Sequence, residues 1–240
     1  MIAKKINFNI YMYLLLPGLI LSVFAVPMFL YSVEHIYLYI LVAVQSYLIG
    51  CTPFGYLIHR IRTGEDIRNY GSGKIGTSNV FRTSGGVIGL LVLCLDASKG
   101  IAVIYICRQL FIDESMLVIS TLLALVGHNW PVILSFKGGR GIAIAAGTLL
   151  VLTTIPALIG LAIFLPVTLI SKYLSLGSIL GVIGAVISIV IMTFFGIYPI
   201  QYSVYGIIAG VVIIFQHRDN IKRIMSRTER KIGQPAVKIK

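Results

Sequence analysis

Charged residues are scarce in this chain, and carboxylates are the scarcest of them. Only 12% of its 240 residues are charged and only eight are aspartate or glutamate, whereas a typical soluble domain is about 25% charged. So few carboxylates give little support to phosphotransfer that depends on carboxylate-bound metal ions, and we expect neither a metal nor a cofactor. The scarcity of charge also argues against a soluble enzyme.

Common catalytic signatures are missing as well. The sequence contains no Gly-x-Ser-x-Gly nucleophile motif and no His-Glu-x-x-His zinc motif. None of its four histidines is followed by aspartate at the His-x4-Asp spacing that many acyltransferases use. Its three cysteines, Cys51, Cys94 and Cys107, lie in or beside apolar runs without metal-binding or redox spacing. We interpret them as reduced packing residues.

Apolar sequence is what the chain has in abundance. Hydrophobic residues make up 58% of it, in runs long enough to cross a bilayer. The runs are continuous and do not alternate, which excludes a transmembrane β-barrel. We therefore predict an all-α, polytopic integral membrane protein. The candidate spans are residues 8–31, 36–58, 86–107, 116–135, 176–195 and 199–216.

The apolar stretch 142–171 does not fit a single crossing. One crossing would place the tail, with eight cations between Arg218 and Lys240, on the outer side, against the tendency of cations to stay in the cytoplasm. Two crossings leave about 14 residues each, or roughly 21 Å, which is short of a core about 30 Å thick. With Pro156 midway, we predict two short helices or a re-entrant hairpin, and about eight helices in all.

The cations also predict orientation and partners. The net charge is +12, and the cations cluster beside the spans, with five of them between His59 and Arg82. This pattern favours cytoplasmic termini and attraction to anionic lipid, and it predicts no nucleic-acid partner. We divide the chain into an N-terminal helix (1–34), a membrane core (35–216) and a basic cytoplasmic tail (217–240).

Two glycine-rich segments interrupt the apolar runs on the predicted cytoplasmic face. The first, 70–82, lacks the Lys-Ser/Thr pair and the preceding strand of a Walker A loop. It still offers glycines, hydroxyls and Arg82 to a phosphate, or else it is an ordinary solvated loop. The second, Gly127–Gly141, contains Lys137-Gly-Gly-Arg140, and its glycines can turn backbone N–H groups toward an anion. The alternative for this second segment is a membrane turn whose cations only anchor it.

Several polar residues sit at or inside the spans. Asp96 and Lys99 are three residues apart within an apolar run, so they are either functional charges or a self-neutralising structural pair. His128 and His217 each end a span, where a histidine can be a base, a phosphate ligand or an interfacial anchor. Asn220 shares a helical face with His217 if the helix continues.

Five motifs of this chain, spread over roughly residues 45–234, resemble motifs of the bacterial acyl-phosphate:glycerol-3-phosphate acyltransferase family (PlsY) and occur in the same order. The segments that carry the resemblance are Pro53-Phe-Gly-Tyr56, Ser72-Gly-Lys-Ile-Gly-Thr-Ser-Asn-Val-Phe-Arg82, Asp96-x-x-Lys99-Gly100, Gly127-His-x-x-Pro131 with Phe136-Lys-Gly-Gly-Arg-Gly141, and His217-Arg-x-Asn220-Ile.

The resemblance implies transfer of a fatty acyl group from acyl phosphate to the 1-hydroxyl of glycerol 3-phosphate, giving lysophosphatidic acid at the inner membrane of a bacterium. It implies no obligate protein partner. By the same resemblance, the catalytic cluster is Ser72, His217 and Asn220. The residues that bind phosphate or orient the acceptor are Gly71, Gly73, Ser78, Asn79, Arg82, Lys137, Gly138, Gly139, Arg140 and Ser175.

The chain departs from the family pattern at four positions. Lys74 stands where the family has Asn, Ser78 where it has Thr, Arg140 where it has Lys, and Cys51 where it has Ser; the helix over 8–31 is additional to the usual seven. Lys74 adds a charge and removes an amide, so it is the change most able to alter the acceptor. A paralogue with another acceptor is therefore one alternative, and a lipid or anion transporter is another.

Overall fold

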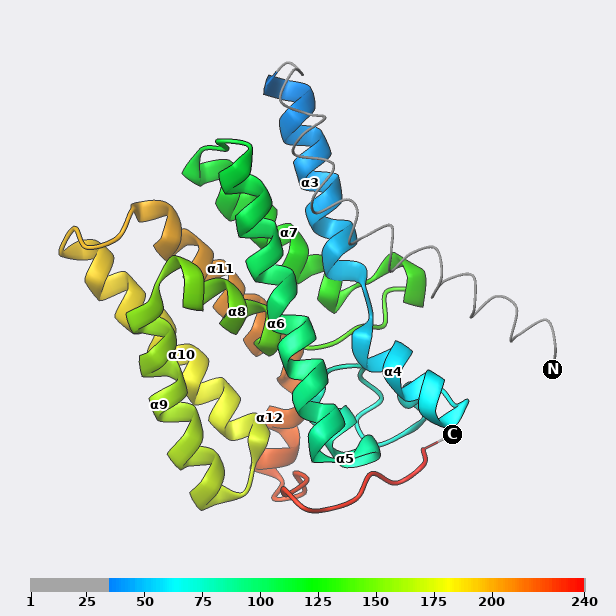
Figure 1. Ribbon diagram of the computed structural model, residues 1–240. Coiled ribbons are helices and arrows are strands. Elements are labelled where there is room, and N and C mark those ends of the chain that lie inside the picture. The colour runs from blue at the N-terminus through cyan, green and yellow to red at the C-terminus, as the bar shows by residue number, and fades with distance from the viewer. Residues whose placement is uncertain (1–34, 240) are drawn as a thin grey trace.

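The computed structural model describes residues 35–239, and within them the protein is a bundle of α-helices (Figure 1). The predicted first span, 8–31, lies outside the described residues. The helices are α3 (His35–Cys51), α4 (Phe54–Thr63), α5 (Thr77–Ser84), α6 (Gly86–Gln109), α7 (Glu114–Asn129), α8 (Ile142–Leu152), α9 (Thr154–Ser171), α10 (Leu174–Phe194), α11 (Ile200–Gln216) and α12 (Arg218–Met225). Short 3-10 turns occupy Ile67–Asn69 and Val132–Leu134.

The prediction of an all-α membrane protein is confirmed. Five helical stretches of the described chain are long and apolar enough to cross a bilayer, or six if α11 and α12, which meet at a bend of 56°, count as one broken span. The total of eight helices stays a prediction, because it includes the first span.

The stretch 142–171 forms two helices, as predicted, but only the first of them is short, and the break is at Thr153 and not at Pro156. Pro156 lies in the first turn of α9, where a missing N–H removes no helical hydrogen bond. The 11 residues of α8 rise only about 16 Å, so α8 is too short to cross alone, while α9 is long enough.

Small residues let the helices approach closely, as is common within membranes. A side chain on Gly127 of α7 would collide with the backbone of Tyr47 on α3, and one on Gly147 of α8 would collide with the backbone of Ala97 on α6. In the same way Gly160 of α9 packs on Gly181 of α10. These glycines bring α7 close to α3, α8 close to α6, and α9 close to α10.

The polar segments gather at one end of the bundle, beside α4, α5 and α12 (Figure 1). After α12 the chain crosses this end: Ile232 N donates to Lys172 O (2.8 Å), Gly71 N donates to Val237 O (2.9 Å), and Ile239 N donates to Asn69 O (2.8 Å). Residues 229–239, which we call the C-terminal strap, therefore pack against the membrane core.

Candidate active site

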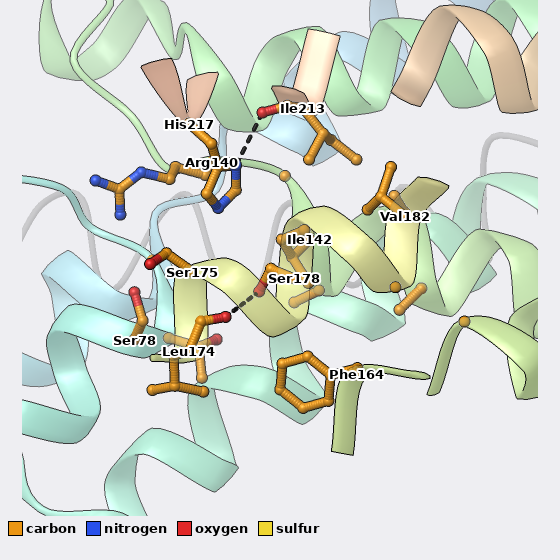
Figure 2. A pocket seen from close by; sticks show the side chains of 18 of the residues that line it. Ser78, Arg140, Ile142, Phe164, Leu174, Ser175, Ser178, Val182, Ile213 and His217 are labelled. Atoms are coloured by element: carbon orange, nitrogen blue, oxygen red, sulfur yellow. Dashed lines mark hydrogen bonds between the residues drawn. The ribbon is translucent and has the colours of Figure 1, made fainter. Parts of the chain in front are cut away.

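A cavity of about 550 Å³ begins among these polar segments and continues between α8, α9, α10 and α11. Figure 2 shows Arg140 and His217 beside each other in its polar part, with Phe164 and Val182 in its apolar part. The polar lining consists of Lys74, Thr77, Ser78, Arg82, Asp96, His128, Arg140, Ser175, Ser178, His217, Asn220 and Glu229, together with Tyr205 deeper in the bundle.

The cavity brings together six of the 13 residues predicted to form the catalytic cluster or to bind substrate. These are Ser78, Arg82, Arg140, Ser175, His217 and Asn220. Ser72 lies in the adjoining loop, where its buried hydroxyl has no hydrogen-bond partner among the described residues. Lys137 is exposed and outside the lining. The roles assigned to all of these residues remain predictions.

Asn79 organises the first glycine loop from within. Its side chain is fully buried: Oδ1 accepts from Ser72 N (3.0 Å), and Nδ2 donates to Tyr70 O (3.0 Å) and Lys74 O (2.9 Å). The loop N–H and C=O groups are thereby satisfied without regular structure. Asn79 therefore holds Ser72 and Lys74 in place. These side-chain hydrogen bonds stay within its own loop, so its contact with a substrate stays a prediction.

The second glycine loop rests on His128. Gly139 N donates to His128 O (3.0 Å), and a side chain on Gly139 would collide with the imidazole of His128. Gly141 closes the loop in the left-handed conformation (φ +86°), which only glycine adopts readily. Glycine is therefore required here for close packing as well as for the turn.

Asp96 and Lys99 form a buried ion pair behind this loop. Lys99 Nζ lies 2.7 Å from Asp96 Oδ1 and 3.4 Å from His128 Nδ1. Since Lys99 only donates, Nδ1 of His128 is the acceptor and its proton sits on Nε2, against Gly139. The structural interpretation of the pair fits this geometry: its two charges neutralise each other and fix the histidine that supports the loop.

His217 ends α11 and presents one ring nitrogen to the cavity. Its Nδ1 lies 2.8 Å from the carbonyl oxygen of Ile213 (Figure 2). A carbonyl can only accept, so Nδ1 carries a proton and Nε2 is left to act as an acceptor. The 56° bend between α11 and α12 turns Asn220 toward the same cavity.

Glu229 is a component of the site that the sequence analysis missed. It is 6% exposed and accepts hydrogen bonds from Ser175 Oγ (3.0 Å) and Asn220 Nδ2 (2.8 Å) at Oε1, and from Arg223 Nε (2.7 Å) at Oε2. It thus joins α10 to α12. The available signal was its rarity, because a single carboxylate stands among the cations of the tail after α12.

The cations at the polar end outnumber the carboxylates that compensate them. Burial, together with repulsion from Arg223 and Arg82, lowers the pKa of Arg140 to about 10. Burial and the positive charges of Arg140 and Arg218 likewise lower the pKa of Lys74. With a pKa of about 10, Arg140 is still protonated near pH 7. An anion placed between Arg140 and Lys74 would relieve this repulsion.

Buried donors near the cavity strengthen its suitability for an anion. Arg82 Nε, Arg140 Nε and Thr77 Oγ1 have no hydrogen-bond partner among the described residues, although buried polar atoms usually have one. Guanidinium groups bind phosphate through paired N–H donors. The polar end therefore suits phosphate groups, while the apolar part suits a hydrocarbon chain.

Comparison with known proteins gives consistent matches. The family model for glycerol-3-phosphate acyltransferase matches residues 40–227. Glycerol-3-phosphate acyltransferase 3 of Dehalococcoides mccartyi is 38% identical over 207 residues, covering 81% of this chain and 96% of that protein. Glycerol-3-phosphate acyltransferase 2 of Moorella thermoacetica is 39% identical over 197 residues, covering 82% and 99%.

Two solved structures share the fold. One is the glycerol 3-phosphate form of PlsY (YgiH), an integral membrane glycerol 3-phosphate acyltransferase; it has a TM-score of 0.74 and 34% identity, covering 81% of this chain and 96% of that one. The lysophosphatidic acid form of PlsY has a TM-score of 0.71 and 32% identity, covering 82% and 96%.

Proposed function

This chain belongs to the glycerol-3-phosphate acyltransferase family, and we propose that it moves a fatty acyl group from acyl phosphate to the 1-hydroxyl of glycerol 3-phosphate, giving lysophosphatidic acid. The observation that carries the proposal is one cavity whose two ends differ in polarity: Arg82 and Arg140 line one end, and apolar side chains line the channel at the other. Both substrates contain a phosphate, and one also contains a hydrocarbon chain.

The cationic end would hold the phosphates and align the reactants. Acyl phosphate is already activated, so the site needs chiefly positioning and neutralisation of charge. Arg82 and Arg140 supply charge, and Ser72 and Ser78 supply hydroxyl donors. In the transfer, the acyl carbon forms an ester bond to the 1-oxygen of glycerol 3-phosphate while its bond to the donor's phosphate oxygen breaks, and phosphate leaves.

His217 is placed to act on the hydroxyl that attacks. Its Nε2 can accept the hydroxyl proton while Nδ1 stays bonded to Ile213 O. Asn220, held at Nδ2 by Glu229, keeps a buried Oδ1 without a partner among the described residues. That oxygen can accept a hydrogen bond from a substrate hydroxyl.

The acyl donor would reach the cavity from the side. Several lining residues are also exposed on the bundle surface, among them Leu93 (37%), Leu150 (46%) and Leu161 (47%). In a membrane this surface faces lipid chains. A lipid-borne acyl phosphate could therefore slide in while its phosphate remains at the polar end.

We place the protein in the bacterial plasma membrane with its polar end in the cytoplasm. The cations of the 59–82 loop and of the tail lie at that end, as the distribution of positive charge in membrane proteins favours. Residues 1–34 would add one further membrane helix to the core.

Lys74, which stands where the family has Asn, lines the cavity, so this departure from the family pattern lies inside the site. This observation favours one second candidate, a paralogue that acylates a different phosphorylated acceptor. Additional positive charge beside Arg140 would suit an acceptor with more negative charge.

The test is an assay of purified protein with palmitoyl phosphate and radiolabelled glycerol 3-phosphate. We expect lysophosphatidic acid from acyl phosphate and none from acyl-CoA, and we expect His217→Ala to abolish transfer while the protein remains folded. Product from acyl-CoA alone would contradict the proposed donor. Transfer to other acceptors but not to glycerol 3-phosphate would establish the paralogue. Full activity in the His217→Ala variant would remove His217 from the mechanism.

A further inference from the structure

Between α10 and α11 the apolar part of the cavity ends well short of the outer ends of these helices. The lining residues nearest those ends are Val186 on α10 and Tyr205 on α11, while Ala157 lies near the start of α9 and Leu150, on α8, is 46% exposed on the bundle surface. Beyond Val186 and Tyr205, α10 and α11 continue with buried core residues, Ile189 (1% exposed) and Tyr202 (6%). The channel therefore has an end wall.

Tyr205 is the dominant side chain of that wall. It is 0% exposed and is the largest fully buried side chain among residues 35–239. Small residues are common in the rest of this part of the lining. The small residues that line the channel are Ala145, Ala157, Gly160, Gly181, Ala185, Gly206, Ala209 and Gly210.

The depth of the channel matches the length of a lipid chain. Tyr205 and His217 are 12 residues apart on the α11 axis, which corresponds to about 18 Å. One leaflet contributes roughly half of the 30 Å hydrocarbon core, so an acyl chain reacting beside His217 extends about as far as Tyr205.

We infer that Tyr205 sets the upper limit on acyl-chain length in this enzyme, together with Ala157, the lining residue closest to the start of α9. The inference rests on the proposed acyl transfer. A chain that fits gains binding with every methylene that it buries, about fourfold each. The first methylene beyond the wall gains nothing and must displace a packed aromatic ring.

The test is the profile of kcat/KM against a series of saturated acyl phosphates of increasing length, with glycerol 3-phosphate as acceptor. We expect Tyr205→Ala to move the optimum to longer chains, with a gain of at least fourfold for chains two carbons above the wild-type optimum. Ala157→Leu should move it to shorter chains. The KM for glycerol 3-phosphate should stay unchanged in both.

Two controls keep the outcome decisive. Val204→Ala changes a side chain on the same helix that is 43% exposed and does not line the cavity, so it should keep the wild-type profile. Ala157 lies only partly buried on α9, so its variant tests the wall even if Tyr205→Ala fails to fold. An unchanged profile in the folded variants would overturn the inference and indicate that the chain leaves sideways past Leu161. Absence of transfer by the wild type at every length would instead refute the proposed function.

Discussion

Single residues in this protein act through the partners that the fold gives them. Glu229 is the clearest case: its carboxylate accepts hydrogen bonds from Ser175, Asn220 and Arg223, and so orients two predicted substrate contacts. Arg140 is the opposite case. Its buried Nε has no partner among the described residues, and its charge is available to an anion.

Arg140 should contribute mainly to phosphate binding. We expect Arg140→Gln to raise the KM for glycerol 3-phosphate by roughly 10- to 100-fold, because a buried hydrogen bond to a charged group contributes about 1.5–3 kcal/mol. Arg140→Lys, which keeps the charge, should lose much less. Steady-state kinetics tests this expectation. Equal KM values in the Arg140→Gln and Arg140→Lys variants would contradict it.

The same residue predicts how binding depends on pH. The pKa of Arg140 is lowered to about 10, so the free site loses this proton as the pH rises through that value. Binding of glycerol 3-phosphate through Arg140 should therefore be constant from pH 7 to 9 and weaken above it. The Arg140→Gln variant should lack that decline at high pH.

At the scale of elements, the site depends on segments that lie far apart in the sequence. The C-terminal strap holds the first glycine loop through two backbone hydrogen bonds, from Gly71 N to Val237 O and from Ile239 N to Asn69 O. It also accepts a long hydrogen bond from Arg82 Nη2 at Arg230 O (3.4 Å). The strap therefore positions the loop that carries Ser72.

Deletion of residues 235–240 should loosen the first glycine loop. We expect the KM for glycerol 3-phosphate to rise by up to about 30-fold, because two hydrogen bonds of about 1 kcal/mol each are lost, while kcat changes little. The matched control is Lys238→Ala, which keeps the backbone hydrogen bonds of the strap and removes the exposed pair with Glu65 (3.5 Å) and the contact of the ammonium with the Tyr70 ring (5.6 Å). It should raise the KM much less than the deletion. A KM equal to that of the wild type in the deletion variant would exclude a positioning role for the strap.

In the molecule as a whole, the candidate active site lies at one end of the bundle and the apolar surface lies along its sides. Its surface is largely apolar along α6, α9, α10 and α11, which suits contact with lipid, while the cations and glycine loops share one end. Two exposed serines, Ser115 in the first turn of α7 and Ser226 directly after α12, belong to opposite ends of the bundle in the predicted topology.

This arrangement predicts an orientation that can be measured. In a cysteine-free background, Ser115→Cys should react with a membrane-impermeant maleimide in intact cells. Ser226→Cys should react only after the membrane is permeabilised, because the positive end is expected to face the cytoplasm. The reverse pattern would place the active site on the outer side.

The sequence by itself determined the class of protein and the composition of one polar end. Membrane helices follow from the length and continuity of apolar runs, and these are local properties. The break between α8 and α9 was also expected, because one crossing would have put the tail's cations on the wrong side, but its position at Thr153 was not. Pro156 is acceptable in the first turn of a helix, so its presence alone could not locate the turn.

Only the tertiary structure decided how the polar residues divide their work. Asn79 and Lys137 carry side chains that suit a phosphate. However, the side chain of Asn79 forms hydrogen bonds within its own loop, and Lys137 is exposed outside the cavity. Glu229 and Tyr205 drew no attention in the sequence, yet one joins α10 to α12 and the other closes the channel. These roles depend on contacts between residues distant in the chain, and such contacts are fixed by packing, which no local pattern contains.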